Sequence, residues 1–203
     1  MTRRLYVISA PSGAGKTSLV QALLQVEPRL RVSVSHTTRR PRPTEHHGRE
    51  YYFVSPAEFQ AIAAAGGFLE HAQVFDNSYG TARAQLEDKL DTGHDVILEI
   101  DWQGARQVRA ALPDCVSIFI LPPSRESLEA RLRSRRTDSD EVIARRLRDA
   151  VADMSHYAEF DYVVVNDRFE ATLAELREIL AGRGDAFRPG RAELAATVRN
   201  LLA

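Results

Sequence analysis

Residues 10–17, which read Ala-Pro-Ser-Gly-Ala-Gly-Lys-Thr, constrain the fold of this chain more than any other segment. An apolar run, Leu5–Ile8, precedes them, and an amphipathic run, Ser18–Leu24, follows. A strand, a glycine-rich turn and a helix in this order make a phosphate-binding loop, because the turn points backbone N–H groups inward and the helix adds its positive dipole end. We expect Lys16 between the phosphates and the Thr17 hydroxyl on Mg²⁺. The sequence therefore predicts a site for a nucleoside triphosphate.

One position of this loop departs from the usual pattern, because Ala10 stands where glycine is usual. Alanine tolerates a positive φ poorly, so the loop either keeps φ negative there or bears strain. The alternative is an ordinary Gly/Ser-rich turn. The flanking strand and helix, which the motif requires, favour the phosphate-binding loop.

Composition excludes several classes of protein. Of the 203 residues 44% are hydrophobic and 27% are charged, which is typical of a globular chain. The net charge of −1 provides no general basic field, so we expect no nucleic-acid partner. No apolar run approaches the length that spans a bilayer, so we expect no membrane partner. Cys115 is the only cysteine, which excludes an intrachain disulfide and indicates a cytoplasmic protein.

Apolar strand patterns alternate with helical patterns along most of the chain. The predicted strands are Leu5–Ser9, Val32–Ser35, Val96–Ile100, Val116–Leu121 and Tyr162–Val165, and the predicted helices are Thr17–Val26, Ala82–Leu90, Trp102–Ala111, Ser124–Arg133, Asp140–Met154 and Glu170–Leu180. Such alternation predicts an α/β fold with three layers, in which helices cover both faces of a parallel core sheet.

Two segments interrupt this alternation. Residues 34–81 are rich in proline and glycine and contain one strand pattern, Tyr51–Val54, and a short helix near Ala57–Ala65, so we interpret them as an inserted antiparallel lobe. Arg125–Arg148 is arginine-rich and predicts two helices with a break near residues 137–139. Thr137 or Asp138 is expected to cap the second helix. Residues 182–190 read as a loop, and 192–202 as a last helix.

Two groups of polar residues suggest ligand chemistry. Glu99 and Asp101 alternate at the end of a buried strand, so they share a face where a carboxylate can hold Mg²⁺ or a water of its shell. Solvated strand-end acids are the alternative. The stretch Ser33–Arg42 carries hydroxyls and arginine forks that suit a phosphate, although taken alone it also fits a solvated loop.

Nine segments in this order and spacing resemble the bacterial guanylate kinases: Ala10–Thr17, Val34–Arg42, Gly48–Tyr51, Phe68–Glu70, Tyr79–Thr81, Asp101–Gly104, Arg131–Ser139, Ile143–Leu147 and Val165–Asp167. The similarity runs from about Leu5 to Leu180. It implies a P-loop nucleoside monophosphate kinase that transfers the γ-phosphoryl group of ATP to GMP with Mg²⁺.

The resemblance also assigns the acceptor residues. It implies that the GMP phosphate is held by Arg39, Arg42, Tyr51 and Tyr79, and that the guanine base is recognised by Ser35, Glu70, Thr81 and Asp101. A carboxylate can accept hydrogen bonds from guanine N1–H and the 2-amino group together, whereas adenine offers no such donor pair. Loss of that pairing can discriminate against AMP, relative to GMP, by a factor of ~10⁴ or more.

The donor residues follow from the same resemblance. ATP is expected on Ala10, Pro11, Ser12, Gly13, Ala14, Gly15, Lys16 and Thr17, with Asn166 near the adenine, and the metal is expected on Thr17 and Glu99. The implied catalytic residues are Lys16, Arg39 and three arginines of the helical lid, Arg131, Arg135 and Arg146. For Arg125, Arg133 and Arg148 we favour the alternative of ordinary helix-surface ion pairs, such as Glu129 with Arg133.

The implied organisation is a single domain over 1–203. It has a core (1–33, 82–124 and 149–183), a GMP-binding lobe (34–81), a lid (125–148) and a C-terminal helix (184–203). The chain departs from the family pattern at Ala10, Asp76, Ser78, Glu99 and Arg136. Two other functions stay open: a noncatalytic phosphopeptide-binding module with the same fold, and a related kinase with another phosphate acceptor. The sequence leaves the oligomeric state open.

Overall fold

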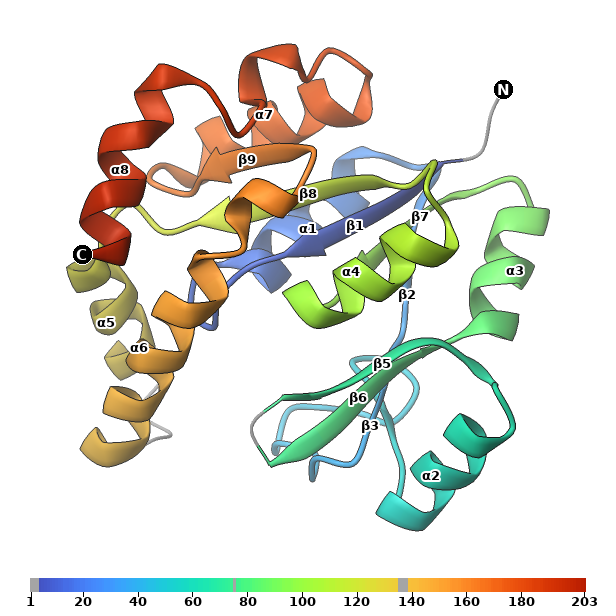
Figure 1. Cartoon of the computed structure of the whole chain (residues 1–203). Coiled ribbons are helices and arrows are strands. Elements are labelled where there is room, and N and C mark those ends of the chain that lie inside the picture. Colours follow the sequence, from blue (N-terminus) through green and yellow to red (C-terminus); the bar gives the residue numbers. More distant parts are fainter. Residues whose placement is uncertain (1–3, 75, 135–138) are drawn as a thin grey trace. The chain divides into compact units, whose positions relative to one another are not determined.

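The computed structural model describes residues 4–74, 76–134 and 139–203 (Figure 1). They form two compact units, which are considered separately here. The first unit comprises the residues up to Val7 and Glu27–Val116, and the second comprises Ile8–Val26 and Ser117–Ala203. Strand β1 (Leu5–Ser9) has residues in both units.

The core sheet is parallel, with the strand order β2-β7-β1-β8-β9. In the first unit β2 (Leu30–Ser33) pairs with β7 (Asp95–Glu99). In the second unit β8 (Val116–Leu121) pairs with β9 (Tyr162–Val165). Most side chains of β1, β7 and β8 are buried, as expected for parallel strands that are covered on both faces. The predicted α/β class with a parallel core sheet is confirmed.

The first unit also contains a smaller sheet, with the order β4-β3-β6-β5. Its strands are β3 (His36–Thr37), β4 (Tyr52–Phe53), β5 (Phe68–Val74) and β6 (Asn77–Ala82). The pairs β3–β6 and β5–β6 are antiparallel, as predicted for this segment, and the short outer pair β3–β4 is parallel. The smaller sheet is therefore mixed.

The helices lie within one residue of the predicted bounds. In the first unit they are α2 (Pro56–Ala64), α3 (Arg83–Asp91) and α4 (Trp102–Ala111); in the second they are α1 (Lys16–Val26), α5 (Arg125–Ser134), α6 (Asp140–Met154), α7 (Phe169–Leu180) and α8 (Ala192–Leu202). Short 3₁₀ turns occur at Tyr157–Glu159 and Asp185–Phe187. Helices α5 and α6 run side by side (Figure 1). Among the helices described, none combines the length and the apolar character that a membrane span needs.

Side chains begin several of these helices. Ser55 and Glu58 form a reciprocal capping box at α2, with Pro56 in the first turn. Asp101 caps α4 by accepting from Gly104 N. Helix α6 is capped by Ser139, whose hydroxyl accepts from Val142 N, so the prediction of a cap at residue 137 or 138 is wrong. Those two residues lie outside the described part of the chain.

Candidate nucleotide sites

The phosphate-loop segment joins β1 to α1 in the second unit. Gly13 and Gly15 have φ values of 95° and 96°, a left-handed conformation that favours glycine. Ala14 N donates to Pro11 O at 3.2 Å, which closes the turn. Helix α1 begins at Lys16, so the first backbone N–H groups of the helix and its positive dipole end lie at the end of the loop.

Neighbouring side chains pack tightly against the two glycines. A Cβ atom on Gly13 would lie 3.0 Å from Cδ1 of Leu128 in α5. A Cβ atom on Gly15 would lie 2.4 Å from Nδ2 of Asn166, closer than real Cβ contacts allow. Both positions therefore favour glycine through their positive φ, and a side chain at Gly15 would also displace the Asn166 side chain. The half-buried Ala10 directly follows β1.

Two predicted site residues from distant parts of the sequence meet at the carbonyl of Ala14. Asn166 Nδ2 donates to this oxygen at 2.7 Å, and Arg131 Nη1 donates to it at 3.3 Å. Arg131 Nη2 also donates to the backbone oxygen of Asn166 at 2.8 Å. The structure thus brings Arg131 and Asn166 to the loop. The contact of Asn166 with adenine stays a prediction.

The arginine-rich helices contain both structural and candidate catalytic residues. Arg133 pairs with Glu129 at 2.9 Å and also with Asp140, which confirms the ion-pair interpretation for Arg133. Arg125 Nε donates to Leu201 O at 2.8 Å, a contact with α8. Arg146 is half-buried on α6. Arg135, the third predicted lid arginine, and Arg136 lie outside the described residues. The two helices share a buried apolar cluster of Leu128, Leu132, Ile143 and Ala150.

The predicted base-recognition residues lie in the first unit and are largely buried. Glu70 in β5 is 3% exposed, Thr81 in β6 is fully buried, and Ser35 is 7% exposed. Thr81 Oγ1 donates to Glu70 Oε1 at 2.6 Å. The other carboxylate oxygen, Oε2, faces Gly104 of α4, where a Cβ atom would lie 2.4 Å from it. A buried carboxylate is thus held at the start of α4.

Asp101 lies at the same end of α4, and its side chain also caps this helix. Its Oδ1 accepts from Gly104 N at 2.9 Å, and its Oδ2 accepts from Gln103 Nε2 at 3.0 Å. Glu99, two residues earlier, ends β7 and is half-buried. The sequence predicted two acids on one face, and the structure shows that one of them caps a helix.

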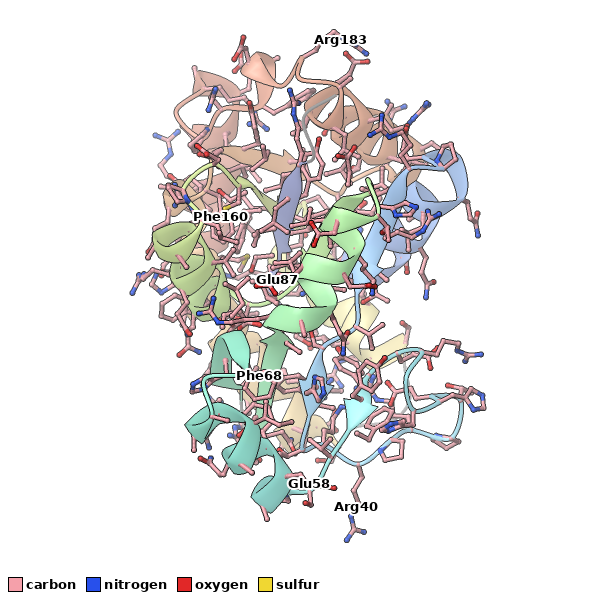
Figure 2. All side chains as sticks on the ribbon, turned by 90° about the vertical axis from the view of Figure 1, so that its right-hand side faces the viewer. Arg40, Glu58, Phe68, Glu87, Phe160 and Arg183 are labelled. Carbon is pink, nitrogen blue, oxygen red and sulfur yellow. The ribbon has the colours of Figure 1, made fainter. Side chains whose placement is uncertain are left out.

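The predicted phosphate-binding residues form a second cluster in the first unit. The Cζ atom of Arg39 lies 5.4 Å from the centroid of the Tyr51 ring, and the ring centroids of Tyr51 and Tyr79 are 5.9 Å apart. Two nitrogens of Arg39 donate to the carboxylate of Glu45, at 2.8 and 2.9 Å. Arg42 N donates to Glu45 Oε2 at 2.7 Å. Arg40, between them, points away from the ribbon (Figure 2).

The comparisons with known proteins agree on one family. The family model described as guanylate kinase matches residues 2–183. The guanylate kinase of Alkalilimnicola ehrlichii is 56% identical over 202 residues, which is 100% of both chains. That of Escherichia coli K12 is 57% identical over 178 residues, 87% of this chain and 86% of its own length. The crystal structure of guanylate kinase from Anaplasma phagocytophilum has a TM-score of 0.76 at 37% identity, with 95% of this chain and 93% of that one covered.

The chain belongs to the guanylate kinase family. The resemblance inferred from the sequence is thereby confirmed, and so is the fold class. Because this family is one of ATP:GMP phosphotransferases, the chain is an enzyme of that class.

In the cluster of Arg39, Arg42, Tyr51 and Tyr79, Glu45 is a residue that the sequence analysis missed. Burial disfavours its ionised form, but hydrogen bonds from Arg39 and Arg42 outweigh this and lower its pKa. Burial also disfavours the charge of Arg39, and Glu45 outweighs it, so the pKa of Arg39 is raised. An acid three residues after Arg42 in a proline-rich turn was the available signal.

The phenol of Tyr51 remains protonated over the physiological range. Burial, reinforced by nearby Tyr79 and Glu99, raises the pKa of Tyr51 to about 12. A protonated phenol donates a hydrogen bond, which suits an anionic ligand.

The residues present fit a magnesium ion that arrives with a nucleotide. The Thr17 hydroxyl is exposed and the Glu99 carboxylate is half-buried, and both supply oxygen, the ligand that Mg²⁺ prefers. Within the described ranges no group of three or more His, Cys, Asp or Glu could hold a metal. Mg²⁺ usually keeps several waters and binds through few protein oxygens together with substrate phosphates, so a sparse protein donor set is what this chemistry requires.

Proposed function

We propose that this chain transfers the γ-phosphoryl group of ATP to GMP, giving ADP and GDP, through the residues described above. One observation carries the choice of acceptor: the buried carboxylate of Glu70, fixed by Thr81 at 2.6 Å. A buried carboxylate needs hydrogen-bond donors, because an unpaired charge is costly to bury. Guanine offers two adjacent donors, N1–H and the 2-amino group, and adenine offers none in that arrangement.

The phosphate of GMP is assigned to the cluster of Arg39, Arg42, Tyr51 and Tyr79. Guanidinium groups bind phosphate oxygens in pairs, and the protonated phenol of Tyr51 adds a donor. Glu45 orients Arg39 by accepting two hydrogen bonds, one from each terminal nitrogen of the guanidinium group. The phosphate itself is the nucleophile and is already ionised, so no general base is needed.

The triphosphate of ATP is assigned to the loop from Ala10 to Thr17. Phosphoryl transfer needs charge placed on the transferring oxygens, in-line geometry and exclusion of water, with little covalent help. Lys16 supplies a mobile positive charge, and Arg131 lies at the loop through its bond to Ala14 O. Arg135 and Arg146 are proposed to add charge from the same helical lid.

Mg²⁺ is assigned to the Thr17 hydroxyl and to Glu99, directly or through water. When bound, the ion neutralises phosphate charge during the transfer. The chain's own contribution is to supply side-chain oxygens at Thr17 and Glu99 and to hold Lys16 and the loop N–H groups in place.

The division into functional parts is proposed to follow the sequence. Residues 34–81 form the GMP-binding lobe, 125–148 the lid and 184–203 a C-terminal segment, with the core made of 1–33, 82–124 and 149–183. A phosphopeptide-binding module would not need the loop lysine or the lid arginines. Lys16, Arg135 and Arg146 are all present in the sequence, which favours the kinase.

A coupled assay that offers ATP with GMP, AMP, CMP or UMP in parallel tests this function. We expect turnover with GMP to exceed that with the other acceptors by ~10⁴. In the variant Glu70→Gln, KM for GMP is expected to rise by roughly 100-fold while KM for ATP changes less than about twofold, because only the acceptor loses a charged partner.

Two results would contradict the proposal. Comparable turnover of AMP and GMP by the unmodified enzyme would exclude guanine recognition by Glu70. An equal effect of Glu70→Gln on both nucleotides would assign that residue to the fold.

A further inference from the structure

A side-chain amide on α4 pairs with the backbone of β5 next to the candidate base-recognition residue. His71 N donates to Gln107 Oε1 at 3.2 Å, and Gln107 Nε2 donates to His71 O at 2.9 Å. Strand β5 stands at the end of its sheet, paired with β6 on one side. The amide of Gln107 has the donor and acceptor of a peptide group, so it takes the place of a neighbouring strand at His71.

The same face of α4 meets the preceding residue of β5 one turn earlier. Gly104 lies three residues before Gln107, so both lie on one side of the helix. A Cβ atom on Gly104 would lie 2.4 Å from Glu70 Oε2 and 3.1 Å from Glu70 Cδ. The backbone of α4 thus lies against the carboxylate of Glu70, and Gln107 holds the next residue.

We infer that Gln107 is a positioning residue that sets the selectivity for guanine by fixing Glu70. The inference rests on the proposed function of Glu70. Thr81 holds Oε1 of the carboxylate within the smaller sheet. The distance of Glu70 from Gly104 and from Asp101, which begins α4, depends on how β5 is held against that helix. The paired amide of Gln107 provides this link.

An ordinary stabilising contact is the competing explanation. Gln107 and His71 are exposed, and hydrogen bonds that compete with water contribute little to the stability of a fold. Removing the amide therefore changes the free energy of unfolding little. A carboxylate that must face two donors of a base at once is far more sensitive to a small displacement.

The experiment compares Gln107→Leu with Gln60→Leu, an exposed glutamine on α2 of the same unit. The acceptors are GMP and inosine monophosphate, which lacks the 2-amino group. In Gln107→Leu we expect kcat/KM for GMP to fall about tenfold, the GMP-to-IMP preference to fall about fivefold, and KM for ATP to stay within about twofold. Gln60→Leu is expected to match the unmodified enzyme. An unchanged preference in Gln107→Leu overturns the inference.

A double-mutant cycle with Glu70→Gln separates this inference from the proposed function. If Gln107 acts through Glu70, then adding Gln107→Leu to Glu70→Gln changes the GMP-to-IMP preference no further. Fully additive losses overturn the inference and leave the proposed function standing. If Glu70→Gln affects GMP and ATP equally, the proposed function itself fails, whatever Gln107→Leu does.

Gly104→Ala provides a second variant that is expected to fold. Alanine is favoured over glycine inside a helix, and the crowded atom is the end of a side chain. Because the Glu70 carboxylate must shift to admit the methyl group, we expect the helix propensity of alanine and this displacement to offset each other in the unfolding temperature, with at least a tenfold rise in KM for GMP. A normal KM in a folded Gly104→Ala variant contradicts the idea that α4 positions the carboxylate.

Discussion

At the scale of single residues, an acid organises the cluster that is proposed to bind the phosphate of GMP. Glu45 accepts from both terminal nitrogens of Arg39 and from the backbone N–H of Arg42, and its side chain is only 11% exposed. A guanidinium has five N–H donors in a fixed fork, so holding one edge by Glu45 orients the rest of the group. The Arg39 side chain therefore loses its conformational entropy when the protein folds and not when a ligand binds, which favours binding.

This arrangement predicts that Arg39 cannot be replaced by another cation. Lysine keeps the charge but lacks the planar fork, so Arg39→Lys is expected to raise KM for GMP by roughly 10- to 100-fold. Steady-state kinetics with each substrate varied in turn would measure this. Arg40→Lys is the matched control, because the exposed Arg40 points away from the ribbon (Figure 2). Equal effects of the two substitutions would show that net charge alone matters.

Single residues also mark the limit of what the sequence predicts. Glu70 was found from a resemblance, and its pairing with Thr81 is consistent with the proposed role. Gln107 and Gly104 were missed, because their importance lies in contacts with residues more than 30 positions away. The local sequence pattern of α4 does not show that the Gln107 amide pairs with the backbone of β5, in the place where a neighbouring strand would pair.

At the scale of elements, periodicity accounts for most of what the sequence predicted. Helices such as α4 and α6 were predicted to the residue, because apolar positions recur with the helical period. The hairpin of β5 and β6 was not predicted as strands. The segment Asn77–Ala82 contains Asn, Ser and Gly, which are weak strand formers, and its pairing with β5 is what defines it.

The phosphate loop provides a prediction at this scale. Gly15 and Gly93 both have positive φ, 96° and 86°, but only Gly15 has a neighbour that a Cβ atom would strike. Both substitutions by alanine are expected to destabilise the fold by about 1 kcal/mol through φ strain. Only Gly15→Ala is expected to lower the affinity for ATP as well, by at least tenfold. The new Cβ atom would displace the Asn166 side chain, which would then lose its hydrogen bond to Ala14 O.

Urea unfolding and ATP titration by calorimetry would measure the two effects separately. If Gly93→Ala weakens ATP binding as much as Gly15→Ala does, general destabilisation explains the loss. If Gly15→Ala binds ATP normally, the contact between Asn166 and the loop has no part in nucleotide binding.

At the scale of the whole molecule, the stability should depend on pH through the half-buried His36. His36 in β3 stacks on Tyr52, with ring centroids 4.9 Å apart, and its Nδ1 is buried without a hydrogen-bond partner. Burial, and then the charge of His47, lowers the pKa of His36. The unfolded chain, with a histidine pKa near 6.5, therefore binds more protons than the folded one below that pH.

The free energy of unfolding is accordingly expected to fall as the pH drops below about 6.5, and to be fully restored above it. Urea titrations between pH 7.5 and 5.5 would measure the slope. His36→Gln removes this titrating group and should flatten the slope, whereas His46→Gln, at an exposed site, should leave it unchanged. A slope that survives His36→Gln would assign the dependence to other groups.

The division of the chain into two compact units has a consequence for how acceptor preference can change. Glu70, Thr81, Arg39 and Gln107 all belong to the first unit, whereas the phosphate loop, Arg131 and Asn166 belong to the second. Under the proposed assignment, substitutions of the guanine-recognising residues are expected to change residues of the first unit alone, whereas the residues assigned to ATP belong to the second. Natural or laboratory selection is therefore expected to change the preference for the acceptor base while the binding of the donor nucleotide stays unchanged.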